Sequence, residues 1–145
     1  MTPDINVLIA AARSDHPHHK VALGWLTQSI AACQDGGRIE ILPMVAAGFL
    51  RLCTHPKIFQ HPTPIKDATA FIDALLAIPG VEMPELGREW PLFSEQCRKE
   101  KLVGNAIPDA WIAAAVTLLG SHLVTFDRDF VRLLPKRAVT VLSGT

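Results

Sequence analysis

Residues 121–130 have the sequence SHLVTFDRDF, in which an apolar run ends at Thr125 and is followed by Asp127 and Asp129. An apolar, β-branched run of this length predicts a buried strand, and the two acids would then lie where that strand ends. In open α/β sheets, ligands bind beyond the carboxyl ends of the strands. The stretch therefore predicts an α/β fold with an acidic site at one edge of its sheet.

Two further acids occupy comparable places in the chain. Asp4 precedes the apolar run INVLIAAA, and Asp109 opens the helix-like run DAWIAAAVTLL. A fold that brings Asp4, Asp109 and Asp127 together would crowd like charges, and crowded carboxylates either take up protons or recruit a cation. Hard oxygen ligands favour Mg²⁺ or Mn²⁺.

Each acid also has a purely structural interpretation. Asp is a preferred residue at helix N-caps, so Asp4 and Asp109 would satisfy free backbone donors there. Asp127 would stabilise a turn by accepting a bond from the backbone two residues ahead. Both interpretations stay open for each acid taken alone, whereas their joint position at strand ends favours a shared site.

The composition predicts one well-cored domain over residues 1–145. The chain has 145 residues, of which 49% are hydrophobic and 19% charged, and strand-like and helix-like segments alternate along it. Such alternation predicts a three-layer α/β/α fold with a central parallel sheet of four to five strands. The expected strands are residues 1–4, 38–42, 81–83, 122–125 and 138–142, and the expected helices are 5–13, 20–33, 44–53, 65–78, 90–101 and 109–119.

The net charge and the cysteine content indicate how the protein could bind nucleic acid and in which compartment it is expected. The formal net charge is zero, so nucleic acid would be bound through local basic clusters such as Arg128 to Arg137, which are otherwise a solvated face. Cys33, Cys53 and Cys97 are odd in number and widely spaced, which predicts free thiols in a reducing compartment. No segment has the pattern of a signal peptide or a membrane span, so we expect a cytoplasmic protein that does not engage membranes.

Four segments of the chain resemble the PIN-domain ribonucleases, and more closely the VapC-type toxins of type II toxin–antitoxin pairs. The segments are DINVLI from Asp4, GFLRLCTHPKIF from Gly48, PDAWIAAAV from Pro108 and LVTFDRDF from Leu123. The resemblance implies a PIN-like fold and an endoribonuclease that depends on Mg²⁺ or Mn²⁺ and acts as a toxin. It further implies an RNA substrate such as tRNA or rRNA, a small cognate antitoxin and a homodimer.

The resemblance also assigns roles to individual residues. It makes Asp4, Asp109 and Asp127 the catalytic residues and metal ligands, with Asp129 as a further ligand. A divalent cation held there suits phosphodiester hydrolysis, because it activates water and neutralises charge that develops on phosphate.

Three polar residues are expected to support these acids. Asn6 and Thr125 are candidates for hydrogen bonds that orient the carboxylates, although Thr125 also suits an ordinary strand position. Arg51 would pair with an acid, contact phosphate or face water.

One position departs from the family pattern. Many relatives carry Glu on the helix after the second strand, where this chain has Gly48 and no acid between Met44 and Leu52. The departure leaves a site with three principal Asp residues. It also leaves a second hypothesis open, in which the protein is a catalytically weak or silent PIN-fold protein that binds an antitoxin or RNA.

Overall fold

The strands form two small parallel sheets in the computed structural model, which describes residues 1–144. One sheet has three strands in the order β1 (Thr2–Pro3), β4 (Leu123–Thr125) and β5 (Val139–Val141). The other pairs β2 (Ile39–Glu40) with β3 (Val81–Glu82). Thr2 lies opposite Leu123, and Leu123 lies opposite Val139. The carboxyl ends of β1, β4 and β5 therefore lie at the same edge.

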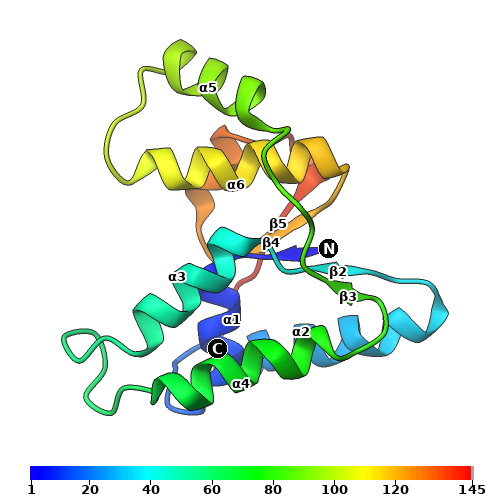
Figure 1. The fold of residues 1–145 in the computed structure, drawn as a ribbon, viewed down its shortest axis with the longest axis vertical. Coiled ribbons are helices and arrows are strands. Elements are labelled where there is room, and N and C mark those ends of the chain that lie inside the picture. Colours follow the sequence, from blue (N-terminus) through cyan, green and yellow to red (C-terminus); the bar gives the residue numbers. More distant parts are fainter. Residues whose placement is uncertain (145) are drawn as a thin grey trace.

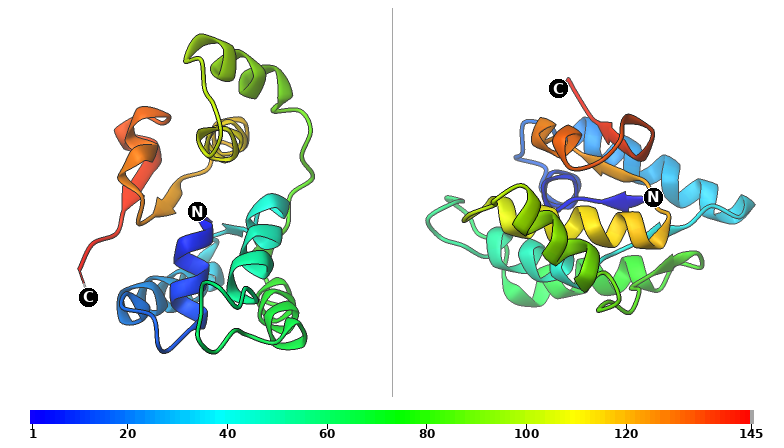
Figure 2. Two further views of the ribbon diagram at one scale, coloured as in Figure 1. Left: turned by 90° about the vertical axis from the view of Figure 1, so that its left-hand side faces the viewer. Right: turned by 90° about the horizontal axis from the view of Figure 1, so that it is seen from above.

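Six α-helices cover the strands. In Figure 1, α5 (Trp90–Lys99) and α6 (Ala106–Leu119) lie above the strands, whereas α1 (Ile5–Ala12), α2 (His19–Ala32) and α4 (Ile65–Leu76) lie below them. The left-hand view in Figure 2, turned about the vertical axis, shows the same order of layers. The remaining helices are α3 (Pro43–Cys53) and the short 3₁₀ segments η1 (Cys33–Asp35), η2 (Arg128–Arg132) and η3 (Lys136–Ala138).

The α/β class, the three layers and the parallel strands are confirmed, but a single sheet of four to five strands is not. The five strands divide into sheets of three and two. Each of β1, β2 and β3 is two residues long, so few backbone groups are available to join the sheets. Across that junction the Glu40 backbone N–H donates to the Met1 carbonyl at 2.9 Å.

The core is one cluster of side chains from the strands and from helices α1, α2, α3, α4 and α6. Five consecutive residues of α1, from Val7 to Ala11, are buried, so this helix presents almost no face to water. Helix α6 buries an alanine-rich stretch from Ala113 to Ala115 together with Val116. Among residues 1–144, no helix combines the length and apolarity needed to cross a membrane.

Two features of α6 determine how it enters and leaves the sheet region. Gly120 at its end has φ +61°, a left-handed conformation that glycine adopts without steric cost and that turns the chain into β4. On α6 itself the Trp111 indole N–H donates to the Glu89 carboxylate at 2.6 Å, and Glu89 is only 2% exposed. The hydrogen bonds from Trp111 and the Gly87 backbone outweigh burial and lower the pKa of Glu89. This ionised group ties the start of α5 to α6.

Segment η2, which follows β4, is anchored by one aromatic side chain. Phe130 is 1% exposed and packs in the main core, and its carbonyl accepts from the backbone N–H groups of Leu133 and Leu134 at 3.0 Å each. The neighbouring Val131 points outward and is 52% exposed. Phe130 therefore fixes the segment that carries the acids after β4.

We expect Phe130→Ala to lower the free energy of unfolding by about 3–5 kcal/mol, the usual cost of emptying a buried aromatic site. Val131→Ala, one residue away but exposed, should change it by less than about 0.5 kcal/mol. Urea unfolding followed by circular dichroism measures both. Equal stability of the two variants would show that Phe130 does not anchor η2.

Candidate active site

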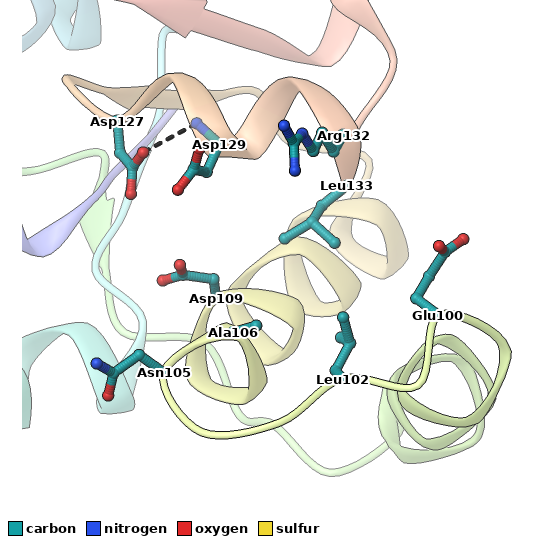
Figure 3. A pocket seen from close by; sticks show the side chains of 9 residues that line it. All are labelled: Glu100, Leu102, Asn105, Ala106, Asp109, Asp127, Asp129, Arg132 and Leu133. Atoms are coloured by element: carbon teal, nitrogen blue, oxygen red, sulfur yellow. Dashed lines mark hydrogen bonds between the residues drawn. The ribbon is translucent and has the colours of Figure 1, made fainter.

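Acidic side chains from separate segments converge at the carboxyl edge of the three-stranded sheet. Asp109 on α6 and the pair Asp127 and Asp129 after β4 line a cavity of about 480 Å³. Figure 3 shows their carboxylates directed into one space. The cavity is completed by Glu100, Leu102, Asn105, Ala106, Arg132 and Leu133.

Asp4 directly follows β1 and is not among the residues that line this cavity. Its side chain is 6% exposed, with Oδ1 accepting from the Ile5 backbone N–H and Oδ2 accepting from the Thr125 hydroxyl, both at 2.7 Å. Burial raises the pKa of Asp4 above its ordinary value, the two hydrogen bonds partly oppose that shift, and the nearby charge of Asp127 adds to it. The helix-cap interpretation is confirmed for Asp4, and it coexists with coupling to the other acids.

Asp127 caps η2. Its Oδ1 accepts from the Asp129 backbone N–H at 2.9 Å, which is the turn bond expected from the sequence (Figure 3). Its own backbone N–H donates to the Thr125 hydroxyl oxygen at 2.9 Å. Because only Oδ1 is used by the turn, Oδ2 is left without a protein hydrogen-bond partner in residues 1–144.

Asp109 is the acid whose protonation is most perturbed. Burial is the largest cause, and the charges of Asp4, Asp127 and Asp129 add to it, so the pKa of Asp109 is raised from 3.8 to about 6. Helix α6 begins at Ala106 instead of at Asp109. The expectation that Asp109 is the N-cap is therefore wrong, because Asn105 holds that position and Asp109 lies within the first turn.

Thr125 links the acids. Its hydroxyl donates to Asp4 and accepts from the Asp127 backbone, and the residue is fully buried. Asn6 lies beside it, with Oδ1 accepting from the Phe126 N–H at 3.2 Å and Nδ2 lying 3.5 Å from the Thr125 hydroxyl. The structure thus places both predicted supporting residues next to the acids.

Arg51 is exposed on α3 and does not line the cavity that contains Asp109, Asp127 and Asp129. Within residues 1–144 it forms no ion pair. The arginine that does line the cavity is Arg132, which the sequence presents only as part of a basic cluster. Arg132 follows Asp129 by three residues, and residues i and i+3 lie on the same side of a 3₁₀ helix. This spacing predicts that Arg132 lies beside Asp129 once the segment is known to be a 3₁₀ helix.

Gly48 is buried where α3 crosses α1. A Cβ atom at this position would overlap Cδ1 of Ile5 and lie 3.1 Å from its Cγ1. The space next to Gly48 is therefore filled by the side chain that directly follows Asp4. Glycine at position 48 and isoleucine at position 5 are complementary in size.

The donor set fits a hard divalent cation by type and charge. It consists of carboxylate oxygens, and burial together with their mutual repulsion raises the pKa values of Asp4 and Asp109. In the arrangement described for residues 1–144, no three His, Cys, Asp or Glu side chains are close enough to hold one ion together. The acids would have to approach one another when a cation binds.

Comparisons with known proteins identify the family of this chain. The PIN domain family matches residues 1–133. Ribonuclease VapC25 of Mycobacterium tuberculosis is 36% identical over 137 residues, and ribonuclease VapC31 of the same species is 37% identical over 139 residues, with 94% of each chain covered in both cases. Ribonuclease VapC43 of that species is 33% identical over 130 residues, covering 89% of this chain and 86% of its own.

A solved structure shows the same fold. The crystal structure of VapBC2 from Rickettsia felis, bound to a DNA fragment from their promoter, includes a chain that superposes with a TM-score of 0.62. The alignment covers 96% of both chains at 14% identity, so it supports the fold alone. From the family match and the extent of similarity to these relatives, the chain belongs to the PIN-domain family and, within it, to the VapC ribonucleases.

Proposed function

We propose that this protein is a divalent-metal-dependent endoribonuclease that acts as the toxin of a toxin–antitoxin pair, with residues 1–145 forming one PIN-like domain. The observation that carries the proposal is the convergence of Asp4, Asp109, Asp127 and Asp129 at one sheet edge, close enough to contribute to raising the pKa of Asp109 to about 6. Membership of the VapC ribonucleases supports RNA as the substrate, with tRNA and rRNA as the candidate targets.

The proposed roles follow from the geometry of the acids. Asp4, Asp109 and Asp127 would hold Mg²⁺ or Mn²⁺, with Asp129 as a further ligand. When bound, such a cation lowers the pKa of water and neutralises charge on a phosphate. The Thr125 hydroxyl holds Oδ2 of Asp4 in place, and Asn6 holds the backbone just before Asp127. These contacts orient the carboxylates without contacting substrate.

We also propose a homodimer that uses the outer face of α5 and α6. Trp90 on α5 is 63% exposed and Val103 in the loop between the two helices is 79% exposed. The apolar side chains of Leu92, Ile107, Trp111 and Leu118 on these helices are each 36–42% exposed. Apolar surface gathered on one pair of helices is typical of protein interfaces. The Rickettsia felis structure is of VapBC2 bound to promoter DNA, and we extend that pairing to a small cognate antitoxin in the cytoplasm here.

Removing one ligand carboxylate tests the activity directly. We expect Asp4→Asn and Asp109→Asn each to lower the rate of RNA cleavage in Mg²⁺ or Mn²⁺ roughly 100-fold or more, because charge stabilisation at the reacting phosphate is lost. Asp73→Asn, an exposed acid on α4, is the matched control and should leave the rate unchanged. Initial rates on total RNA, with circular dichroism to verify folding, decide the outcome.

Two results of that experiment would contradict the proposal. Wild-type rates in a folded Asp4→Asn or Asp109→Asn protein would remove these residues from the site. Absence of cleavage by the wild-type protein, together with binding to RNA or antitoxin, would instead favour the silent PIN-fold alternative.

The raised pKa of Asp109 gives a pH dependence of stability in the metal-free protein. The folded state binds a proton at Asp109 more tightly than the unfolded state, whose pKa is near 3.8. Its stabilising contribution is complete below pH 3.8 and is lost as the pH rises through about 6. In EDTA, Asp109→Asn should therefore stabilise the protein at pH 7 by roughly 1–2 kcal/mol, discounted for partial exposure, and much less at pH 4.

Urea unfolding in EDTA at pH 4, 5, 6 and 7 measures this difference between wild type and variant. Asp73→Asn again serves as the control, since its side chain is exposed on the far helix. A stabilisation by Asp109→Asn that is the same at all four pH values would mean that charge repulsion is not its cause.

The packing at Gly48 predicts a coupled pair of substitutions. Gly48→Glu alone should destabilise the protein by about 1–3 kcal/mol, because the new side chain meets Ile5 in a packed region. Gly48→Glu combined with Ile5→Ala should relieve the overlap and add a carboxylate close to Asp4. Isothermal titration with Mn²⁺ is then expected to show tighter binding than in Ile5→Ala alone. Equal affinities of those two proteins would show that an acid at position 48 does not reach the site.

A further inference from the structure

Helix α5 and the turns beside it are attached to the rest of the protein by few buried contacts. Of residues 88–103, all of which the structure describes, Glu89 is the one that is buried. None of these residues belongs to the main core or packs against it, whereas Leu86 packs against the core and Ile112 is part of it. In Figure 1 and in the left-hand view of Figure 2, α5 lies at the outer end of the molecule, where it packs on α6.

The packing of α5 on α6 leaves space unfilled. A cavity of about 40 Å³ lies between the two helices, lined on α5 by Leu92 and Gln96 and on α6 by small side chains that include Ala113 and Ala114. Segments that bury little apolar surface are the ones that open locally while the remainder of a protein stays folded. The interface between α5 and α6 has this property.

Glycines bound this segment on both sides, in conformations that other residues rarely adopt. Gly87 has φ +133° and Gly104 has φ +60°, and a Cβ atom at either position would meet no atom within 4 Å. Glycine is therefore needed there for its backbone freedom and not for close packing. Residues 88–103 can swing about the line that joins these two glycines, because hinges are formed by a few positions that absorb changes in φ and ψ.

Trp111 on α6 is the point at which the segment is attached. Its indole N–H donates to Oε2 of Glu89, and the Gly87 N–H donates to Oε1, both at 2.6 Å. Phe93 stacks on the same indole, with the ring centroids 6.2 Å apart. Hydrogen bonds to a charged group are strong, but the carboxylate regains such bonds from water when it is exposed. This attachment is therefore reversible in a way that burial of a large apolar side chain is not.

The other end of α5 forms a wall of the cavity that contains the site acids. The Leu102 N–H donates to the Cys97 carbonyl at 3.0 Å and Lys101 has a left-handed φ of +50°, so the helix closes with a Schellman turn. The turn brings Glu100 and Leu102 to the cavity, at the end away from Asp127 (Figure 3). Because the turn is hydrogen-bonded to α5, this wall moves with the helix.

We propose that residues 88–103 are a hinged lid on the cavity of the acids, and that the contact between Glu89 and Trp111 is the latch that holds the lid closed. Opening carries the Glu100 carboxylate away from the site acids, so the negative charge at the cavity falls and a phosphate enters more readily. Glu89 is accordingly a positioning residue, which acts on the cavity through α5. The role of the lid in admitting RNA rests on the proposed function, whereas the lid and its latch do not.

Hydrogen–deuterium exchange, resolved by mass spectrometry of peptides, measures the population of the open lid. In the wild-type protein we expect the amides of α5 to exchange roughly 100-fold faster than those of α1, because α5 opens without global unfolding. Glu89→Gln should raise exchange in α5 roughly 10-fold further. An amide offers one acceptor oxygen where the carboxylate offers two, so the N–H of Trp111 or of Gly87 loses its partner.

Two controls accompany Glu89→Gln at the same protein concentration. Glu85→Gln, at an exposed acid in the preceding loop, should leave exchange in α5 unchanged. Ile72→Val removes a buried methylene in α4 and should raise exchange in α1 but not in α5, since the lost stability is the same with the lid open and closed. Exchange in α5 as slow as in α1, or equal effects of Glu89→Gln and Glu85→Gln, would overturn the proposal.

A double-mutant cycle tests whether the latch is the contact with Trp111. Trp111→Phe keeps an aromatic ring beside Phe93 and removes the indole N–H. If Glu89 and Trp111 act together, the double variant should exchange in α5 less than about twice as fast as the faster single variant. Effects of the two substitutions that multiply would show that they act separately and would refute this latch.

The association rate of RNA shows whether the lid admits the substrate. In the full-length Asp109→Asn background, stopped-flow fluorescence measures the association rate constant of a labelled RNA. Binding that requires the open lid scales with its population, so Glu89→Gln should raise this constant by the same roughly 10-fold factor as exchange in α5, and Glu85→Gln should not. An unchanged constant beside faster exchange would refute admission through the lid. Latch-dependent exchange in a protein that neither binds nor cleaves RNA would contradict the proposed function and retain the lid.

Discussion

The hydrogen bond from the Thr125 hydroxyl to the Asp4 carboxylate joins the two ends of the chain at the site, and the arrangement of the acids depends on it. It spans 121 positions of sequence and is buried. The parallel pairing of β1 with β4 makes it possible, because the Asp4 backbone N–H donates to the Val124 carbonyl at 2.9 Å and brings Asp4 beside Thr125. The same hydroxyl accepts from the Asp127 backbone. One small polar side chain therefore sets the spacing of Asp4 and Asp127.

Repulsion between the carboxylates around this bond destabilises the metal-free fold. Four carboxylates converge at a place where the described cavity lining includes one basic side chain, Arg132, so the metal-free fold holds an excess of negative charge. That cost is confined to one edge of the sheet, whereas the other edge and the helices supply a continuous apolar core. The fold tolerates repulsion at the site because α1 and η2 are anchored by Val7, Leu8 and Phe130, which are almost completely buried.

Much of this arrangement is predictable from local sequence. The apolar runs next to Asp4 and Asp127 identify strand ends and helix starts, and the parallel α/β pattern brings such ends to one edge. The sheet boundary is not predictable, because strands of two residues carry too little periodicity to show where pairing stops. The start of α6 differs from the expected one since Pro108 looks like a helix boundary, although proline is tolerated in the first turn of a helix.

Which arginine lines the cavity also cannot be predicted from the sequence alone. Arg51 belongs to a segment that resembles the family, but it is exposed near the end of α3 and does not line the cavity of the acids. Arg132 stands in a run of basic residues, and only the 3₁₀ geometry of η2 aligns it with Asp129. Which charged residue reaches a site is thus decided by helix type and length, which residue composition does not specify.

The bond between Trp111 and Glu89 has a consequence for how the protein can evolve. Trp111 follows Asp109 by two residues, about 200° around the helix, so one side of α6 carries an acid of the site while the other is tied to α5. Phe93 stacks on Trp111 and also contacts Trp90 on the exposed face. A substitution on that face which shifts α5 therefore also turns the helix that positions Asp109. The exposed apolar face of α5 and α6 and the position of Asp109 therefore depend on the same helix, so substitutions that alter one are expected to affect the other.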